Sequence, residues 1–375
     1  TDIQKENKSG GKVPNLRFPE FEGEWEVKKL GEVATNFMYG MNAAATVYDG
    51  ENQYIRITDI DERTRLFTPN PLSSPDGELE DKYLLEKGDI LFARTGASVG
   101  KSYLYSEKDG KIFFAGFLIR LNVKTENPYF IFSQTLTEKY QKWVLTMSMR
   151  SGQPGINAEE YKLLSIVIPS IQEQEKISSF LLLIDERIQT QNKIINDLKT
   201  LKTATAKKIF LQELRLKDDN GNDFPEWEED CLENVCDIKK GEQFNKEDLN
   251  EIGLYPCLNG GISPSGFSEK YNTDENTITI SEGGNSCGFV NFMKTKFWLG
   301  GHCYKILLFK KISLMYFYQL LKFNEQNVMN LRVGSGLPNI QMKSLKRFTI
   351  KISTSESEQT KIANFLSAID SKIDM

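Results

Sequence analysis

A glycine-rich segment near residue 100 has the residue types of a phosphate-binding loop. Gly96–Ser102 reads Gly-Ala-Ser-Val-Gly-Lys-Ser and directly follows the apolar stretch Asp89–Ala93. A phosphate-binding loop needs four residues between its glycines so that successive amides surround the phosphates, whereas three separate Gly96 from Gly100. A related segment, Gly284–Gly288, is not followed by lysine and serine. We therefore interpret both segments as exposed glycine-rich loops rather than nucleotide sites.

Other residues that could do chemistry do not form a catalytic set. His302 is the only histidine, so a site with histidine acid–base or triad chemistry can occur at most once. Asp76 and Glu80–Lys82 are too close in sequence to bring carboxylates from adjacent strands onto one metal ion, and we interpret them as a solvated loop. The Asn/Asp-Pro-Pro-aromatic segment and the glycine-rich methyl-donor loop of DNA methylation are also absent. We predict that this chain is not an enzyme.

The cysteines indicate reduced thiols. All five lie in the second half of the chain without a Cys-x-x-Cys pair, which is typical of an intracellular protein without disulfides. A zinc site built from His302, Cys303 and another cysteine is an alternative, but tetrahedral sites normally pair their ligands two to four residues apart. We therefore predict no metal and no cofactor in this chain.

The loops carry side chains suited to nucleic acid. Arg and Lys bond the guanine edge, Gln the adenine edge, and Ser or Thr the phosphates. An ordinary solvated loop is the alternative for any one of these residues. The candidate DNA-binding residues are Arg94, Thr95, Ser98, Lys101, Ser102, Arg150, Ser151 and Gln153 in the first half, and Lys239, Lys240, Gln243, Asn245, Lys246, Asn285, Ser286, Arg332 and Ser335 in the second.

An internal repeat places these loops in two related frames. Ser151–Ile156 recurs as Ser335–Ile340, and Glu173–Ile188 recurs in part as Glu358–Ile373. The openings also match, since Phe18-Pro-Glu and Phe224-Pro-Glu are each followed by Trp-Glu. The identities exceed what average residue usage gives. A period near 200 residues is too long for a solenoid and predicts two tandem domains, each followed by a helix.

A long helix is expected to follow the first copy, from about Ile171 to Leu214. Its apolar residues recur at alternating steps of four and three, which is typical of a coiled-coil seam, although Gln191 and Lys202 are polar seam positions. At about 1.5 Å per residue it could reach ~65 Å. The second copy contains only the opening of such a helix, so we expect a shortened partner. The predicted seam and partner-docking residues are Ile177, Leu181, Ile184, Ile188, Ile195, Leu198, Ile362, Leu366, Ile369 and Ile373.

Composition fits an ordinary chain with two cores. It is 39% hydrophobic and 26% charged, with a net charge of −5. Short apolar stretches such as Tyr54–Ile60 and Lys111–Val123 predict strands. Pro128–Thr146 predicts a helix whose buried face is Phe130, Leu136, Tyr140 and Trp143. No run approaches a membrane span and no signal-peptide pattern is present, so we expect a cytoplasmic protein without membrane contact. The acidity disfavours nucleic acid only mildly, because the local field governs a contact.

These motifs together resemble a known family. Leu16–Phe21, Leu30–Val33, Gly88–Leu91 with Arg94–Gly96, Ser151–Ile156, and Ile168-Pro followed by Glu173–Ile177 occur in the order found in the specificity subunits of bacterial type I restriction–modification enzymes. The chain resembles these proteins from Asn15 onward. We expect only the opening of the family's long C-terminal helix in this sequence.

The resemblance implies a fold and a set of partners. It implies an α+β chain with two tandem mixed α/β target-recognition domains, each followed by a helix, and the helices pairing as an antiparallel coiled-coil spacer. Each domain would read one half of an asymmetric bipartite site on double-stranded DNA, held roughly one helical turn (~34 Å) apart. Two methyltransferase subunits would dock on the helices and restriction subunits would join the complex. S-adenosylmethionine, ATP and magnesium would belong to these partners.

The implied domain boundaries follow the repeat. We predict a flexible tail at 1–14, a first target-recognition domain at 15–170, a spacer helix at 171–217, a second target-recognition domain at 218–356, and the start of a second spacer helix at 357–375. Two alternatives remain open: the specificity portion of a single-chain restriction enzyme, and an assembly adaptor that does not bind DNA.

Overall fold

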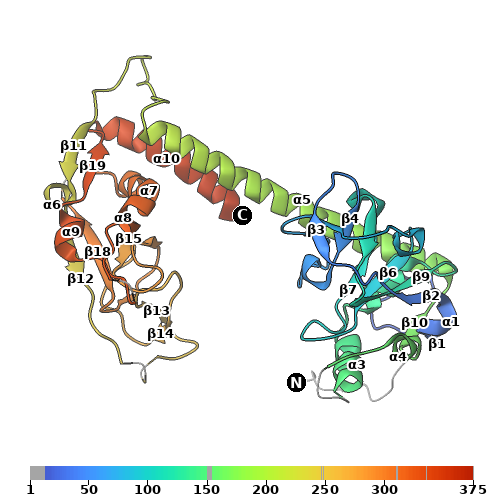
Figure 1. The fold of residues 1–375 in the computed structure, drawn as a ribbon. Coiled ribbons are helices and arrows are strands. Elements are labelled where there is room, and N and C mark those ends of the chain that lie inside the picture. Colours follow the sequence, from blue (N-terminus) through green and yellow to red (C-terminus); the bar gives the residue numbers. More distant parts are fainter. Residues whose placement is uncertain are drawn as a thin grey trace. The chain divides into compact units, whose positions relative to one another are not determined.

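The computed structural model describes residues 13–149, 154–245, 247, 249–309, 311–334 and 336–374. The chain divides into two compact units, unit 1 (residues 1–188) and unit 2 (residues 189–375), and the division falls within the long helix α5 (Ile171–Phe210) (Figure 1). Each unit mixes strands and helices, as predicted.

Unit 1 is built on a four-stranded antiparallel sheet in the order β2-β9-β6-β7. Ile90, Phe92, Ile119 and Leu121 of this sheet are fully buried against the following helices. Its elements are β1 (Glu26–Lys29), α1 (Leu30–Val33), β2 (Ala34–Tyr39), β3 (Ala45–Val47), β4 (Gln53–Ile55), η1 (Ile57–Asp59), β5 (Ser73–Pro75), η2 (Asp81–Tyr83), β6 (Asp89–Ala93), β7 (Ser102–Leu104), η3 (Glu107–Asp109), β8 (Ile112–Phe114), β9 (Leu118–Val123), α2 (Pro128–Gln134), α3 (Glu138–Ser148), α4 (Ala158–Lys162) and β10 (Ser165–Ile168).

Unit 2 repeats this sheet although its sequence has diverged. Its antiparallel order β12-β18-β15-β16 is equivalent to β2-β9-β6-β7. Its elements are β11 (Glu228–Cys231), α6 (Leu232–Val235), β12 (Cys236–Lys240), β13 (Tyr255–Leu258), β14 (Gly266–Ser268), β15 (Thr277–Ser281), β16 (Val290–Met293), β17 (Trp298–Leu299), β18 (Cys303–Leu308), α7 (Leu314–Phe323), α8 (Glu325–Met329), α9 (Met342–Lys346), β19 (Thr349–Ile352) and α10 (Glu356–Asp374).

The ends of each copy are joined in the same way. Strand β1 pairs with β10 and strand β11 pairs with β19, both antiparallel. The amide of Leu30 donates to the carbonyl of Leu164 at 2.9 Å, and the amide of Leu232 donates to the carbonyl of Phe348 at 3.0 Å. The two copies of the sequence repeat therefore fold in the same way, with the first strand of each unit paired to its last strand.

Two helix predictions need correction. The expected helix over 128–146 is two helices, α2 and α3, because the Thr137 side chain caps a new start. Leu136 lies in the connection and is 48% exposed, so its predicted burial was wrong. Helix α5 ends at Phe210 rather than near Leu214, and Gln212 takes a left-handed φ of 60° just beyond it.

Helix α10 runs antiparallel to the last part of α5 within unit 2. Lys202 Nζ lies 2.7 Å from Asp370 Oδ1, whereas Lys361 Nζ donates to the carbonyl of Lys217 at 2.8 Å. Ile362 and Leu366, predicted for the seam, are buried in the core of unit 2 together with Ile209 and Phe210. Earlier in α5 the predicted seam is open: Ile184 and Ile188 are 40% and 53% exposed.

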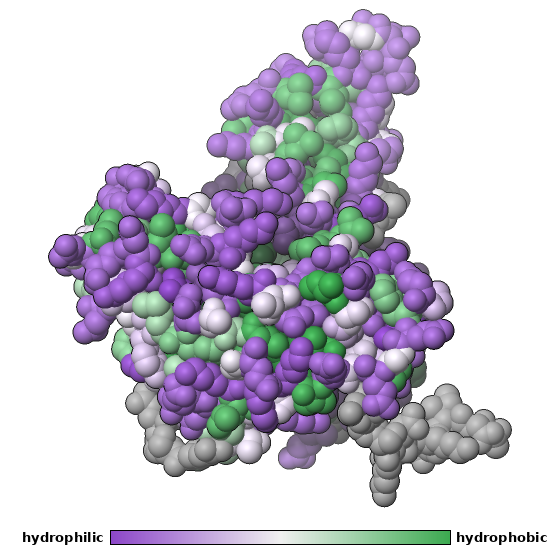
Figure 2. Space-filling view, turned by 90° about the vertical axis from the view of Figure 1, so that its right-hand side faces the viewer, coloured by the Kyte–Doolittle hydropathy of each residue, from purple (hydrophilic) through white to green (hydrophobic). Residues whose placement is uncertain are grey.

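Most of the face drawn in Figure 2 is hydrophilic, with hydrophobic residues in patches between. Among the described helices, none combines the length and the apolarity needed to cross a bilayer.

Candidate nucleic-acid interface

Unit 1 joins its two predicted recognition loops by backbone hydrogen bonds. Gly96 of the glycine-rich loop donates its amide to the carbonyl of Pro154 at 3.1 Å, and the amide of Ile156 donates to the carbonyl of Arg94 at 2.9 Å. A bridge also pairs Thr95 with Gly155. Two segments some sixty residues apart in the sequence thus form one surface.

Unit 2 builds the same junction with different side chains. Gly284 donates to the carbonyl of Pro338 at 3.0 Å, and Ile340 donates to the carbonyl of Glu282 at 2.8 Å. Arg94 and Glu282 therefore hold equivalent backbone positions, just after β6 and β15.

Packing against a helix explains why the second position of each loop is glycine. Gly100 and Gly288 have φ of 83° and 91°, in the left-handed region that favours glycine. A Cβ atom at Gly100 would lie 2.6 Å from the Val144 side chain, and one at Gly288 would lie 2.8 Å from the Met329 Cα atom. The second glycine of each loop is therefore required for close approach to a helix.

A third segment adjoins each surface, at Phe117 in unit 1 and at His302 in unit 2. The sequence did not indicate that these segments belong to the surface. The amide of Arg94 donates to the carbonyl of Phe117 at 3.1 Å, and the amide of Glu282 donates to the carbonyl of His302 at 2.8 Å. The ends of β2 and β12 lie beside these residues: Gly40 donates to Leu118 and Gly241 to Cys303. The available signal was the recurrence of glycine after β2 and β12.

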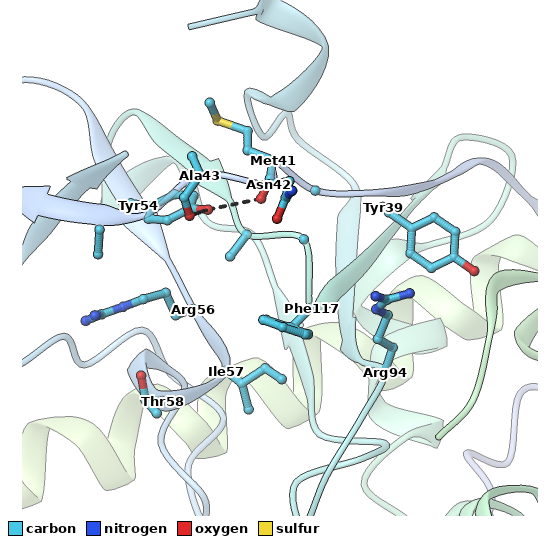
Figure 3. Close-up of a pocket in the computed structure, with 14 residues that line it drawn as sticks. Tyr39, Met41, Asn42, Ala43, Tyr54, Arg56, Ile57, Thr58, Arg94 and Phe117 are labelled. Carbon is cyan, nitrogen blue, oxygen red and sulfur yellow. Dashed lines mark hydrogen bonds between the residues drawn. The ribbon is translucent and has the colours of Figure 1, made fainter. Parts of the chain in front are cut away.

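In unit 1 Arg94 and Phe117 lie at an open cleft of about 660 Å³, which residues 39–43 and 56–58 also line (Figure 3). The lining residues with hydrogen-bonding or aromatic side chains include Tyr39, Asn42, Arg56, Thr58, Arg94 and Phe117, and the lining residues without such side chains are small or apolar. The Arg94 guanidinium carbon lies 4.8 Å from the centre of the Tyr39 ring and 5.8 Å from that of Phe117. Arg94 Nε is buried without a hydrogen-bond partner. A cation is thus held on aromatic faces with unused donors.

In unit 2 the equivalent position is acidic. Glu282 Oε1 accepts from Lys240 Nζ at 2.7 Å and from the Tyr304 hydroxyl at 2.8 Å. Burial, and then the hydrogen bond to Glu282, raises the pKa of Tyr304. His302 is exposed beside this cluster. The two surfaces therefore share a backbone frame and differ in the charge at its centre.

The chain is similar to proteins of known family. A model of the type I restriction modification DNA specificity domain matches residues 22–200 and 225–375. The chain belongs to this family. The predicted fold class is confirmed: two specificity domains, each followed by a helix, with α10 antiparallel to α5.

Named relatives agree with the family match. A putative type I specificity subunit of Mycoplasma genitalium is 34% identical over 150 residues, which is 40% of this chain and 39% of that protein. A putative type I specificity subunit of Mycoplasma pneumoniae is also 34% identical over 150 residues, which is 40% of this chain and 40% of that protein. The chain thus matches about two fifths of the length of each of these two relatives. A putative type I restriction enzyme specificity subunit of Methanocaldococcus jannaschii is 26% identical over 94% of this chain and 88% of its own.

A solved structure supports the same fold. The crystal structure of the type I restriction–modification S subunit of M. genitalium matches with a TM-score of 0.69 at 19% identity, over 97% of this chain and 93% of that one.

Two predicted DNA-binding residues of the first specificity domain lie inside it. Lys101 is 7% exposed, and its Nζ donates to the Ile60 carbonyl at 3.1 Å and pairs with Glu62 at 2.6 Å. Ser102 is 1% exposed and shares a hydrogen bond of 2.6 Å with Thr135. Their assignment to a contact surface is corrected, because β7 begins at Ser102 and turns both side chains into the fold.

The remaining candidate DNA-binding residues that the structure describes are partly or fully exposed. Thr95, Ser98 and Ser286 are partly exposed, whereas Lys239, Lys240, Gln243, Asn245, Asn285 and Arg332 are exposed. Arg150, Ser151, Gln153, Lys246 and Ser335 lie outside the described residues.

The cysteines of the second specificity domain are free. Cys236, Cys257, Cys287 and Cys303 are buried, and Cys231 is partly exposed. Within the described ranges, no three His, Cys, Asp or Glu side chains gather as a metal site would require.

Proposed function

We propose that this chain is the DNA sequence-recognition subunit of a type I restriction–modification complex. Each specificity domain reads one half of an asymmetric bipartite target on double-stranded DNA. The observation that carries this proposal is the duplicated three-segment surface, in which Arg94 of one domain is replaced by Glu282 in the other. A shared frame with different side chains is suited to reading two unlike sequences.

The chemistry is assigned to partner subunits. We propose that two methyltransferase subunits dock on the helices, that restriction subunits join through the complex, and that S-adenosylmethionine, ATP and Mg²⁺ act in those cytoplasmic partners. This chain would supply positioning only. The exposed apolar side chains of α5, such as Leu183 at 66% and Ile188 at 53%, support a docking role.

Sequencing of methylated bases tests the proposal. The chain is co-expressed with its cognate methyltransferase subunit in cells that lack other methylation, and genomic methylation is mapped. The expected result is a bipartite motif with two unlike halves and a fixed gap. An assembled complex that methylates without any sequence motif would contradict the proposal.

A further inference from the structure

Arg94 and Glu282 occupy the same backbone position in the two specificity domains, where three segments of the surface meet. Arg94 and Glu282 follow equivalent strands, and each is bonded through its backbone to both adjoining segments of the surface. The backbone hydrogen bonds hold each Cα in place whatever the side chain is. A substitution here changes the chemistry of the surface without changing the frame.

The Arg94 side chain has no hydrogen-bond acceptor among the described residues. Arg56, which lines the same cleft, pairs with Asp59 at 2.8 Å. Arg94 instead lies against the rings of Tyr39 and Phe117 at the edge of the cleft, with a buried Nε that donates to nothing (Figure 3). Because an unmet buried donor is costly, the side chain is suited to an acceptor supplied by a ligand.

Glu282 has the opposite arrangement. Its Oε1 atom accepts both hydrogen bonds, from Lys240 and Tyr304, which holds the carboxylate in place. The side chain is 14% exposed, and Oε2 accepts from no described residue. A fixed carboxylate with one open oxygen is suited to a donor such as an amino group.

We propose that Arg94 and Glu282 are specificity-determining residues that read opposite base chemistry from one shared position. Arg94 bonds the O6 and N7 acceptors of a guanine, and Glu282 Oε2 accepts from the N4 amino group of a cytosine. Tyr39 and Phe117 act as positioning residues for Arg94, and Lys240 and Tyr304 act as positioning residues for Glu282. This inference rests on the proposed function, and it explains why the two half-sites differ.

The test measures discrimination, not affinity alone. Complexes of the full chain with its methyltransferase subunit are bound to the wild-type target and to duplexes that each carry one changed base pair. The wild-type complex should lose roughly ten- to hundredfold in affinity at the base pair read by Arg94. With Arg94→Gln, changing that base pair should lower the affinity by less than about threefold, while discrimination in the other half-site stays as in the wild type. Glu282→Gln should do the same in the other half-site.

Matched variants control for general damage. Arg63→Gln and Glu269→Gln remove the same charges from exposed positions of the same domains, and they should leave discrimination unchanged at every base pair. Retained discrimination in the unmutated half-site reports that each variant still folds and assembles. Full discrimination at every base pair in both Arg94→Gln and Glu282→Gln would overturn this inference and leave the proposed function intact. A wild-type complex without discrimination anywhere would overturn the proposed function itself.

Discussion

The indole nitrogen of Trp227 donates to Glu358 Oε2 at 2.8 Å, across 131 residues of sequence. Trp25 makes the corresponding bond to Glu173 in unit 1, at 3.2 Å. Each carboxylate sits in the first turn of a long helix, so the bond fastens that helix to the start of its own domain.

Removing this carboxylate should destabilise unit 2. Glu358→Ala leaves the buried Trp227 N–H without its acceptor and removes the 2.6 Å hydrogen bond of the Ser353 hydroxyl, and we expect a loss of about 2–4 kcal/mol in the free energy of unfolding. Denaturant unfolding followed by tryptophan fluorescence measures it. Asn364→Ala, at an exposed position of the same helix, should change stability by less than about 0.5 kcal/mol. Equal effects of the two substitutions would contradict this role of Glu358.

The two glycines of one loop should differ in tolerance. Gly284→Ala meets no atom within 4 Å and has only the strain of φ at 78°, about 1 kcal/mol. Gly288→Ala has comparable strain and also brings Cβ to 2.8 Å from the Met329 backbone. The second variant should therefore lower the melting temperature more than the first. Thermal unfolding of both proteins checks the order, and the reverse order would refute the packing argument.

Thiol reactivity should separate one cysteine from the other four. Burial raises the pKa of Cys303 to about 11 and that of Cys236 to about 12, above the ordinary value of 9.0. Cys231 is partly exposed. At pH 8 in native buffer, alkylation followed by mass spectrometry should label Cys231 first, because the thiolate is the reacting form. Fast labelling of Cys303 would count against its burial.

The same pKa values set the sign of a pH dependence. Between pH 9 and 11 the unfolded thiol of Cys303 loses its proton while the folded one keeps it, so the unfolded state binds fewer protons and stability falls as pH rises. Replacing Cys303 by Ser should flatten the decline over this range. A stability that rises from pH 9 to 11 would contradict the assignment.

The length of α5 should set the gap in the DNA target. Deleting one heptad, 189–195, removes about 10 Å of helix and keeps the phase of the seam. The gap should shorten by roughly three base pairs, at ~3.4 Å each, while both half-site sequences stay the same. Sequencing of methylated DNA reads both properties, with Asn192→Ala as a control of unchanged length. Altered half-sites with an unaltered gap would refute the spacer role.

The repeat could be predicted because its identities are in side chains with structural tasks. Gln174 Oε1 accepts a hydrogen bond from the Asn127 amide at 3.0 Å, and Gln359 Oε1 accepts one from the Ser313 amide at 2.8 Å. Asn127 and Ser313 are the N-cap residues of α2 and α7, so each glutamine joins its long helix to the start of an earlier helix. Such tasks keep residue types recognisable. The long helix was predictable because its apolar residues recur with the period of an α-helix.

The candidate nucleic-acid interface was less predictable because backbone groups hold it together. Loops bonded through amides and carbonyls leave no side-chain signature, so the equivalence of Arg94 and Glu282 is invisible until the strands are seen. Tyr39 and Phe117 were missed for this reason. Lys101 and Ser102 were misplaced because the sequence does not show where the loop ends and β7 begins.

The most direct test exchanges one proposed recognition surface for the other. Residues 30–164 are replaced by residues 232–348, cut where Leu30 bonds Leu164 and Leu232 bonds Phe348 in the same way. The hybrid chain, assembled with methyltransferase subunits, is then used for sequencing of methylated DNA. If each domain reads one half-site, the motif should have two identical halves, both matching the unit 2 half of the wild-type target. A hybrid that assembles and still methylates the original motif with unlike halves would contradict the account.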